Sequence, residues 1–226
     1  ATGPGITHTW DFGDGSPTEN TVNATHTFST AGTFTVTHTI SNGSCSLSTT
    51  ATVTTVDSPT ALITGTNNFC SGGNPVLSAA TSTPGSGSIS SYQWQLNGNN
   101  IGGATASTYT ATVPGDFTVV ITNSNGCSSV SAVFTITSSN NPTATIAGSN
   151  SFCSGSNTVL SAAGSLPGSG TISSYQWQLN GSDIGGATAS TYTATSAGTY
   201  TVVVVNSIGC SNTSAGFTVT AYASPV

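Results

Sequence analysis

The chain has 226 residues, of which 3% are charged; lysine and arginine are absent, and the formal net charge is -6. An ordinary soluble domain carries roughly 25% charged residues, so this chain has no electrostatic basis for binding nucleic-acid phosphates or an anionic membrane surface. No apolar run reaches the roughly 18 residues that a spanning helix needs, so no membrane insertion is expected. The remaining composition, rich in β-branched residues with recurring aromatic residues, predicts an all-β protein.

The first 56 residues carry a set of motifs of their own. WDFGDG stands at 10–15, HTF at 26–28 and GTFTV at 32–36. These motifs resemble the PKD (polycystic kidney disease) domain. The resemblance implies a β-sandwich that serves mostly as a spacer or adhesive module in extracellular proteins.

The rest of the chain is an internal duplication. Residues 60–138 match residues 143–221 at a constant offset of 83 without a gap, and most of the matched positions are identical. Such a close match indicates a tandem array of one structural unit. We therefore expect three domains, at 1–56, 57–138 and 139–221, with residues 222–226 beginning a linker to a further module or tail.

Each copy reads as short strands separated by turns. Hydrophobic patterning and turn signals such as Asn-Gly and Pro-Gly predict strands in the first copy, and these lie at 61–65, 75–80, 90–96, 107–112, 116–123 and 131–137. In YQWQLN the alternation places Trp94 on the core face, and Trp177 takes the same position in the second copy. Trp10 of the first module is expected in the core as well.

The motifs YQWQ, STYT and GTYTVVVVNSIGC (198–210) resemble bacterial immunoglobulin-like (Ig-like) repeats of large secreted proteins, especially those of Bacteroidota. The resemblance implies tandem Ig-like β-sandwiches, and the short linkers with Pro59 and Pro142 favour a semi-rigid rod. Tyr200 stands where such folds often have a tyrosine corner, whose hydroxyl bonds the backbone. Phe117 replaces it in the first copy and has no hydroxyl to make this bond.

The five cysteines predict a disulfide framework. Each repeat has one cysteine before its core tryptophan and one after it, which suggests the pairs Cys70–Cys127 and Cys153–Cys210. Such pairs indicate an oxidising, extracellular compartment. Cys45 aligns with the late cysteines but has no early partner, so we expect it to be unpaired or bonded to a cysteine outside this sequence.

The first module is short at its N-terminal end, because Trp10 lies only nine residues from the start. Its sandwich is therefore expected to lack about two strands, which would leave open strand edges. Three explanations remain open. The missing strands lie upstream on a longer polypeptide, or a neighbouring subunit donates a strand, or the sandwich is shortened and Cys45 is free or cross-linked.

The candidate chemical sites are few. Asp11, Asp14 and Glu19 surround a glycine-rich turn and are candidate Ca²⁺ ligands, although Asp and Gly also build tight turns unaided; no other cofactor is indicated. His26 is expected to be packed, whereas His8 and His38 are expected to face solvent on strands. No nucleophile elbow or oxyanion motif is present, so no enzyme activity is expected. N-glycosylation sequons occur at Asn23, Asn42, Asn180 and Asn212.

The leading functional interpretation is a non-enzymatic structural part of an extracellular fibre or cell-surface stalk. Its expected partners are other copies of itself or further modules of the same polypeptide, with strand complementation as one mode of assembly. An alternative is an adhesin-type module that recognises a glycan or a surface protein through the loops at 97–106 and 180–189. A third interpretation is an accessory region of a large secreted hydrolase.

Overall fold

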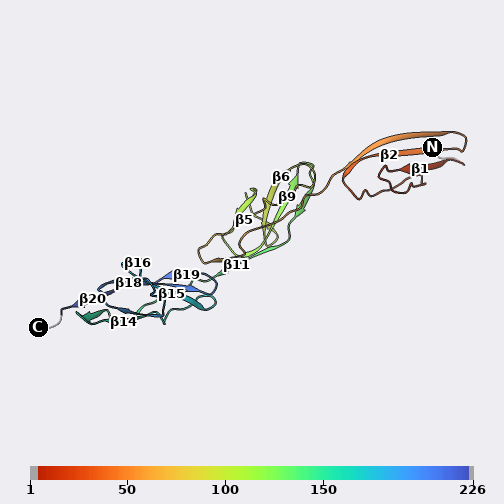
Figure 1. Cartoon of the computed structure of the whole chain (residues 1–226). Coiled ribbons are helices and arrows are strands. Elements are labelled where there is room, and N and C mark those ends of the chain that lie inside the picture. Colours follow the sequence, from red (N-terminus) through yellow and green to blue (C-terminus); the bar gives the residue numbers. More distant parts are fainter. Residues whose placement is uncertain (1–4, 224–226) are drawn as a thin grey trace. The chain divides into compact units, whose positions relative to one another are not determined.

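The computed structural model describes residues 5–223, and every regular element among them is a β-strand (Figure 1). The described chain forms two compact units. Unit 1 comprises residues 1–64, 77–109 and 116–134, and unit 2 comprises residues 65–76, 110–115 and 135–226. The tandem β-sandwich fold class predicted from the sequence is confirmed.

The first module, within unit 1, is a single three-stranded antiparallel sheet. Its order is β1-β2-β3, formed by β1 (Thr7–Asp11), β2 (Gly32–Ser41) and β3 (Ser46–Thr55). The β2–β3 hairpin is paired along all ten residues of both strands. Alternating Thr with Val, Phe and Ile gives this hairpin its β propensity.

Aromatic and histidine side chains pack on this sheet in place of an aliphatic core. Trp10 stacks on His38 with ring centroids 3.9 Å apart, and Phe12 stacks on His26 at 4.0 Å. Trp10 is only partly buried, because the described part of the module has no second sheet to cover it. This corrects the expectation of a core position. His8 is buried against His38, and their ring nitrogens lie 3.0 Å apart, so the expectation that both face solvent is wrong.

The first repeat copy contains eight strands: β4 (Asn68–Cys70), β5 (Val76–Ser78), β6 (Ile89–Leu96), β7 (Asn99–Asn100), β8 (Thr108–Thr110), β9 (Gly115–Asn123), β10 (Ser128–Val130) and β11 (Phe134–Ser139). In unit 1, β6 pairs antiparallel with β9, and Trp94 is fully buried among residues of this pair. In unit 2, β4 pairs parallel with β11. The predicted strand at 61–65 makes only isolated bridges, at Thr60 and Thr64.

The second copy lies wholly in unit 2 and is a two-layer sandwich. One sheet has the order β13-β20-β18-β15-β16, with β19 on β18, and the other has the order β12-β14-β17. Its strands are β12 (Ala147–Gly148), β13 (Ser151–Cys153), β14 (Thr158–Ser161), β15 (Ile172–Leu179), β16 (Ser182–Asp183), β17 (Thr191–Ala194), β18 (Gly198–Asn206), β19 (Ser211–Thr213) and β20 (Phe217–Tyr222).

The core of this sandwich forms where the two sheets face each other. Inward-facing positions of β18 alternate with outward-facing ones, as a half-buried strand requires. The fully buried set comes from both sheets and consists of Leu160, Ala162, Trp177, Ala194, Tyr200, Val202, Val204 and Val219. The hydroxyl of Tyr200 donates to the carbonyl of Ser196 at 2.8 Å, which is the backbone bond expected of a tyrosine corner.

Candidate functional site: a disulfide-bonded junction between repeats

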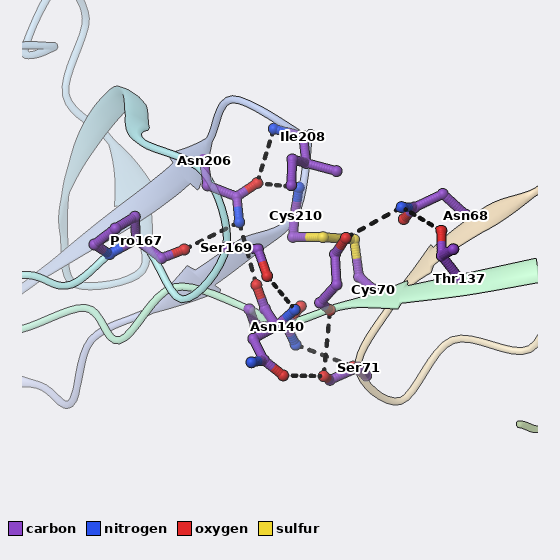
Figure 2. Close-up of a disulfide and its surroundings, with 12 residues drawn as sticks. Asn68, Cys70, Ser71, Thr137, Asn140, Pro167, Ser169, Asn206, Ile208 and Cys210 are labelled. Carbon is purple, nitrogen blue, oxygen red and sulfur yellow. Dashed lines mark hydrogen bonds between the residues drawn. A yellow bond between two sulfur atoms is a disulfide. The ribbon is translucent and has the colours of Figure 1, made fainter. Parts of the chain in front are cut away.

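Among residues 5–223 there is one disulfide, and it joins cysteines of the two repeat copies. Cys70, at the end of β4, is bonded to Cys210, which follows β18, across 140 residues of sequence (Figure 2). Both cysteines belong to unit 2. The thiols of Cys45, Cys127 and Cys153 are free. The predicted pairs Cys70–Cys127 and Cys153–Cys210 are therefore wrong.

The geometry of the second copy explains the error. Cys153 pairs with Tyr222, the last residue of β20. Because β20 runs antiparallel to β18 and its first residue, Phe217, pairs with Tyr200 near the start of β18, Tyr222 lies beyond that start. Cys210 follows the opposite end of β18. Nine strand residues span roughly 25 Å, whereas disulfide-bonded cysteines have Cα atoms within about 7 Å. The early and late cysteines of one sandwich therefore lie at opposite ends of it.

A buried asparagine organises the Cys210 side of the junction. The Oδ1 atom of Asn206 accepts the backbone N–H groups of Ile208 and Cys210, at 3.1 and 2.9 Å. Its Nδ2 donates to the carbonyls of Asn140 and Pro167, at 3.2 and 3.0 Å. Asn206 is 1% exposed. One side chain thus shapes the cysteine loop and holds the linker between the copies against it (Figure 2).

The Cys70 side is held to the same linker. The N–H of Ser71 donates to the carbonyl of Ser139 at 2.8 Å, and the Nδ2 of Asn141 donates to the carbonyl of Ser71 at 3.0 Å. The N–H of Asn140 donates to the hydroxyl of Ser169. Hydrogen bonds and a covalent bond therefore fix the linker at residues 140–142 on both of its sides.

Unit 1 contains a similar asparagine-braced loop. Asn123, also 1% exposed, accepts the N–H of Cys127 at 3.0 Å through Oδ1. Its Nδ2 donates to the carbonyls of Asp57 and Pro84, both at 3.0 Å. Asp57 belongs to the linker that precedes the first copy. Sequence patterning alone does not single out these asparagines. A signal exists, because Asn123 and Asn206 are equivalent positions of the two copies and each stands shortly before the late cysteine.

The acidic turn of the first module does not gather its carboxylates. The Oδ1 of Asp11 accepts the N–H of Gly13, and the Oδ1 of Asp14 accepts the N–H of Ser16. The Oδ2 of Asp14 lies 2.7 Å from Nε2 of His26. Hydrogen bonds from Ser16 and His26 lower the pKa of Asp14 to about 2. Within residues 5–223 no group of three or more His, Cys, Asp or Glu residues converges as metal ligands, and Ca²⁺ binding by Asp11, Asp14 and Glu19 stays a prediction.

The four sequon asparagines are all exposed, and three of them have defined roles. Asn42 and Asn180 accept backbone N–H groups through Oδ1, and Nδ2 of Asn212 donates to the carbonyl of Pro142. N-glycosylation at Asn23, Asn42, Asn180 and Asn212 stays a prediction. Among the described residues, no helix is long and apolar enough to cross a membrane.

Comparison with known protein families identifies the domain type. Residues 1–55 match a PKD domain model, and residues 139–221 match a second PKD domain model. These matches support PKD-type domains at residues 1–55 and 139–221, and the PKD resemblance thus extends to the second repeat copy.

Similar solved structures are distant. They include fibronectin(III)-like modules of CbhA from Clostridium thermocellum (15% identity, 71% of this chain and 95% of that chain, TM-score 0.42). Extracellular domains 3–5 of Drosophila OTK show 13% identity over 96% of this chain and 85% of that chain, with a TM-score of 0.41. Murine CEACAM1b shows 12% identity over 71% of this chain and all of that chain, with a TM-score of 0.33. No curated protein sequence matches the chain.

Proposed function

We propose that the protein is a non-enzymatic structural component of an extracellular fibre or cell-surface stalk, of the kind made by Bacteroidota, which assembles by strand complementation. PKD and Ig-like domains are typically non-catalytic modules, and PKD domains and disulfides are typical of extracellular proteins. The near absence of charge, with Ser and Thr over a third of the chain, supports surfaces that pack against other copies rather than stay apart by repulsion.

The observation that carries the proposal is the open edge of β3. This strand pairs with β2 over its whole length, and among the described residues no strand occupies its other edge. Residues 46–52 of β3 are all exposed. A ten-residue edge strand without a charged residue or a proline offers unpaired N–H and C=O groups to another chain.

The repeat copies contain examples of a strand that adds in parallel to the edge of a sheet. The last strand of the second copy, β20, pairs antiparallel with β18 on one edge and parallel with β13 on the other. In the first copy, β4 adds to β11 in the same parallel way. A parallel strand supplied by another copy or by a further module of the same polypeptide would complete β3 in the same manner.

The test is assembly of the full chain, followed by sedimentation and negative-stain electron microscopy. Thr50→Lys with Thr52→Lys places two positive charges on the open edge, which is how natural edge strands resist pairing. We expect the wild-type chain to form elongated assemblies and this variant to stay monomeric with an unchanged circular dichroism spectrum.

Thr35→Lys is the matched control, because Thr35 is exposed on β2 and pairs with Thr52. The control should assemble as the wild type does. Assembly of the edge variant to the wild-type extent would overturn strand complementation, and a wild-type chain that stays monomeric at all concentrations would overturn the fibre function.

A further inference from the structure

Cys153 takes the structural position of the bonded Cys70, one repeat further along the chain. Cys70 lies opposite Ser139 in the parallel pair of β4 and β11, and Cys153 lies opposite Tyr222 in the parallel pair of β13 and β20. In both places the residue after the cysteine donates its N–H to the opposite carbonyl, at 2.8 and 2.7 Å. Cys153 is exposed and its thiol is free.

Cys45 takes the structural position of the bonded Cys210. In each case an asparagine braces the loop. The N–H of Asn206 donates to the carbonyl of Cys210 at 2.9 Å, and that of Asn42 donates to the carbonyl of Cys45 at 3.1 Å. The cysteine N–H donates back to the asparagine Oδ1, at 2.9 and 2.8 Å respectively. The Cys45 thiol is also exposed and free.

The free thiols of Cys45 and Cys153 lie at opposite ends of their respective domains. Cys45 follows Ser41, which pairs with Thr7 at the beginning of β1, so Cys45 lies at the N-terminal end of the first module. Cys153 lies beside Tyr222, the last residue of β20, so it lies at the C-terminal end of the second repeat copy. Cys153 therefore corresponds to Cys70 in the bonded junction, and Cys45 corresponds to Cys210.

Exposed apolar surface accompanies both thiols. Ile6, Ile40 and Leu47 line a pocket of about 190 Å³ that includes Cys45 and has no charged residue in its lining, and Leu47 is 69% exposed. Beside Cys153, Tyr222 is 61% exposed, whereas the equivalent Ser139 of the first copy is 6% exposed. Contact between these two ends would remove apolar surface from water at both.

We propose that Cys153 of one copy forms a disulfide with Cys45 of a second copy, which links copies of this chain head to tail. The bonded pair of Cys70 and Cys210 is the template, because it joins the same two structural positions within one chain. Cys127 is a less accessible disulfide partner for Cys153 than Cys45 is, because Cys127 is partly buried. The inference rests on the proposed fibre function and adds a covalent link to it.

The chemistry is thiol–disulfide exchange with a disulfide oxidant. The Cys153 thiolate attacks the oxidant and releases one reduced thiol, and the Cys45 thiolate of the other copy then attacks the mixed disulfide and releases the second. Two protein thiols lose two electrons and two protons in total. The oxidant gains both and becomes two thiols.

The experiment oxidises the purified full chain in a glutathione redox buffer and analyses it on non-reducing gels. We expect a ladder of multimers for the wild type and for the matched control Cys127→Ser. Cys45→Ser and Cys153→Ser should each stay monomeric. An equal mixture of these two variants should give a dimer and nothing larger, because each contributes one usable thiol. Chymotryptic mapping of the dimer should recover a peptide pair that joins Cys45 to Cys153.

Several results would overturn the inference. These are links of Cys45 to Cys45 or of Cys153 to Cys153, a ladder lost in Cys127→Ser, or a wild-type chain that ends as monomers capped by glutathione. The fibre function is tested separately, because strand complementation requires no cysteine. Wild-type assemblies in electron micrographs that contain no covalent multimers after oxidation would retain the fibre function and reject the disulfide link.

Discussion

Cys70 is bonded to Cys210 of the next repeat and not to Cys127 of its own. The bond therefore connects cysteines of two repeat copies rather than two cysteines of one copy. The carbonyl of Asn140, which Asn206 binds, belongs to the linker between these copies. The disulfide and the hydrogen bonds of Asn206 thus act together on the same few linker residues.

The first prediction concerns this bond. Cys70→Ser and Cys210→Ser should each lower the free energy of unfolding of unit 2 by about 2–4 kcal/mol, the usual contribution of a native disulfide. The double variant should cost no more than either single one, because both remove the same bond. Thermal unfolding followed by circular dichroism measures the loss. Cys127→Ser, whose thiol is free, is the control, and an equal loss in it would contradict the assignment.

Local patterning is sufficient to predict the long strands and the core tryptophans of the two repeat copies, but not the partly buried position of Trp10. The alternation in YQWQL placed Trp94 and Trp177 inside, and both are fully buried. Local patterning does not predict β4 and β13, which have three residues each. These strands form because each pairs in parallel with the last strand of its repeat copy, β11 or β20. A three-residue strand carries no periodicity to detect.

The candidate site could be predicted only in part, for a related reason. Cysteine spacing predicts that disulfides form but not which cysteines pair. The pairing depends on which end of the sandwich each cysteine occupies, and that follows from β13 adding to β20. For Asp11 and Asp14 the sequence is compatible with both metal ligation and local turn bonding, and in the structure the backbone N–H group two residues later donates to one oxygen of each.

The second prediction concerns the buried asparagine of the junction. Asn206→Ala removes four hydrogen bonds, of which the one from the N–H of Cys210 is buried and the other three are partly buried. A buried polar group left without a partner costs roughly 1–3 kcal/mol. We expect a loss of about 3 kcal/mol or more in chemical denaturation of unit 2. Asn212→Ala is the matched control, because Asn212 is exposed and donates one hydrogen bond to Pro142. Similar losses in both variants would contradict the role of burial.

The third prediction uses the difference between the two copies at Phe117 and Tyr200. Tyr200→Phe removes the hydroxyl that donates to Ser196 and should cost about 1 kcal/mol. Burial raises the pKa of Tyr200 in the folded state. The protonated Tyr200 therefore contributes its full stabilisation to the free energy of unfolding below pH 10, and this contribution is lost as the pH rises through the higher folded-state pKa. The free energy of unfolding, measured between pH 9 and pH 11, should therefore fall less steeply with pH in Tyr200→Phe than in the wild type. Tyr92→Phe, at a partly buried position of β6, controls for a general effect of tyrosine ionisation.

The fourth prediction concerns Asp14 and His26 in the first module. Because hydrogen bonds from Ser16 and His26 lower the pKa of Asp14 from 3.8 to about 2, the folded state favours the carboxylate more than the unfolded state does. The stabilisation is complete above the unfolded pKa near 4 and disappears as the pH falls toward 2. Fluorescence of Trp10, recorded in a variant whose Trp94 and Trp177 are replaced by Phe, should report an acid transition of this module between pH 4 and pH 2.

Asp14→Asn should flatten this transition, because an amide does not titrate in that range. Asp11→Asn changes a neighbouring carboxylate whose described role is one bond from the N–H of Gly13, so it serves as the matched control and should leave the transition in place. A transition that persists unchanged in Asp14→Asn would mean that other carboxylates determine the acid stability of the module. The aromatic stack of His26 on Phe12 would then hold the turn without help from the Asp14 charge.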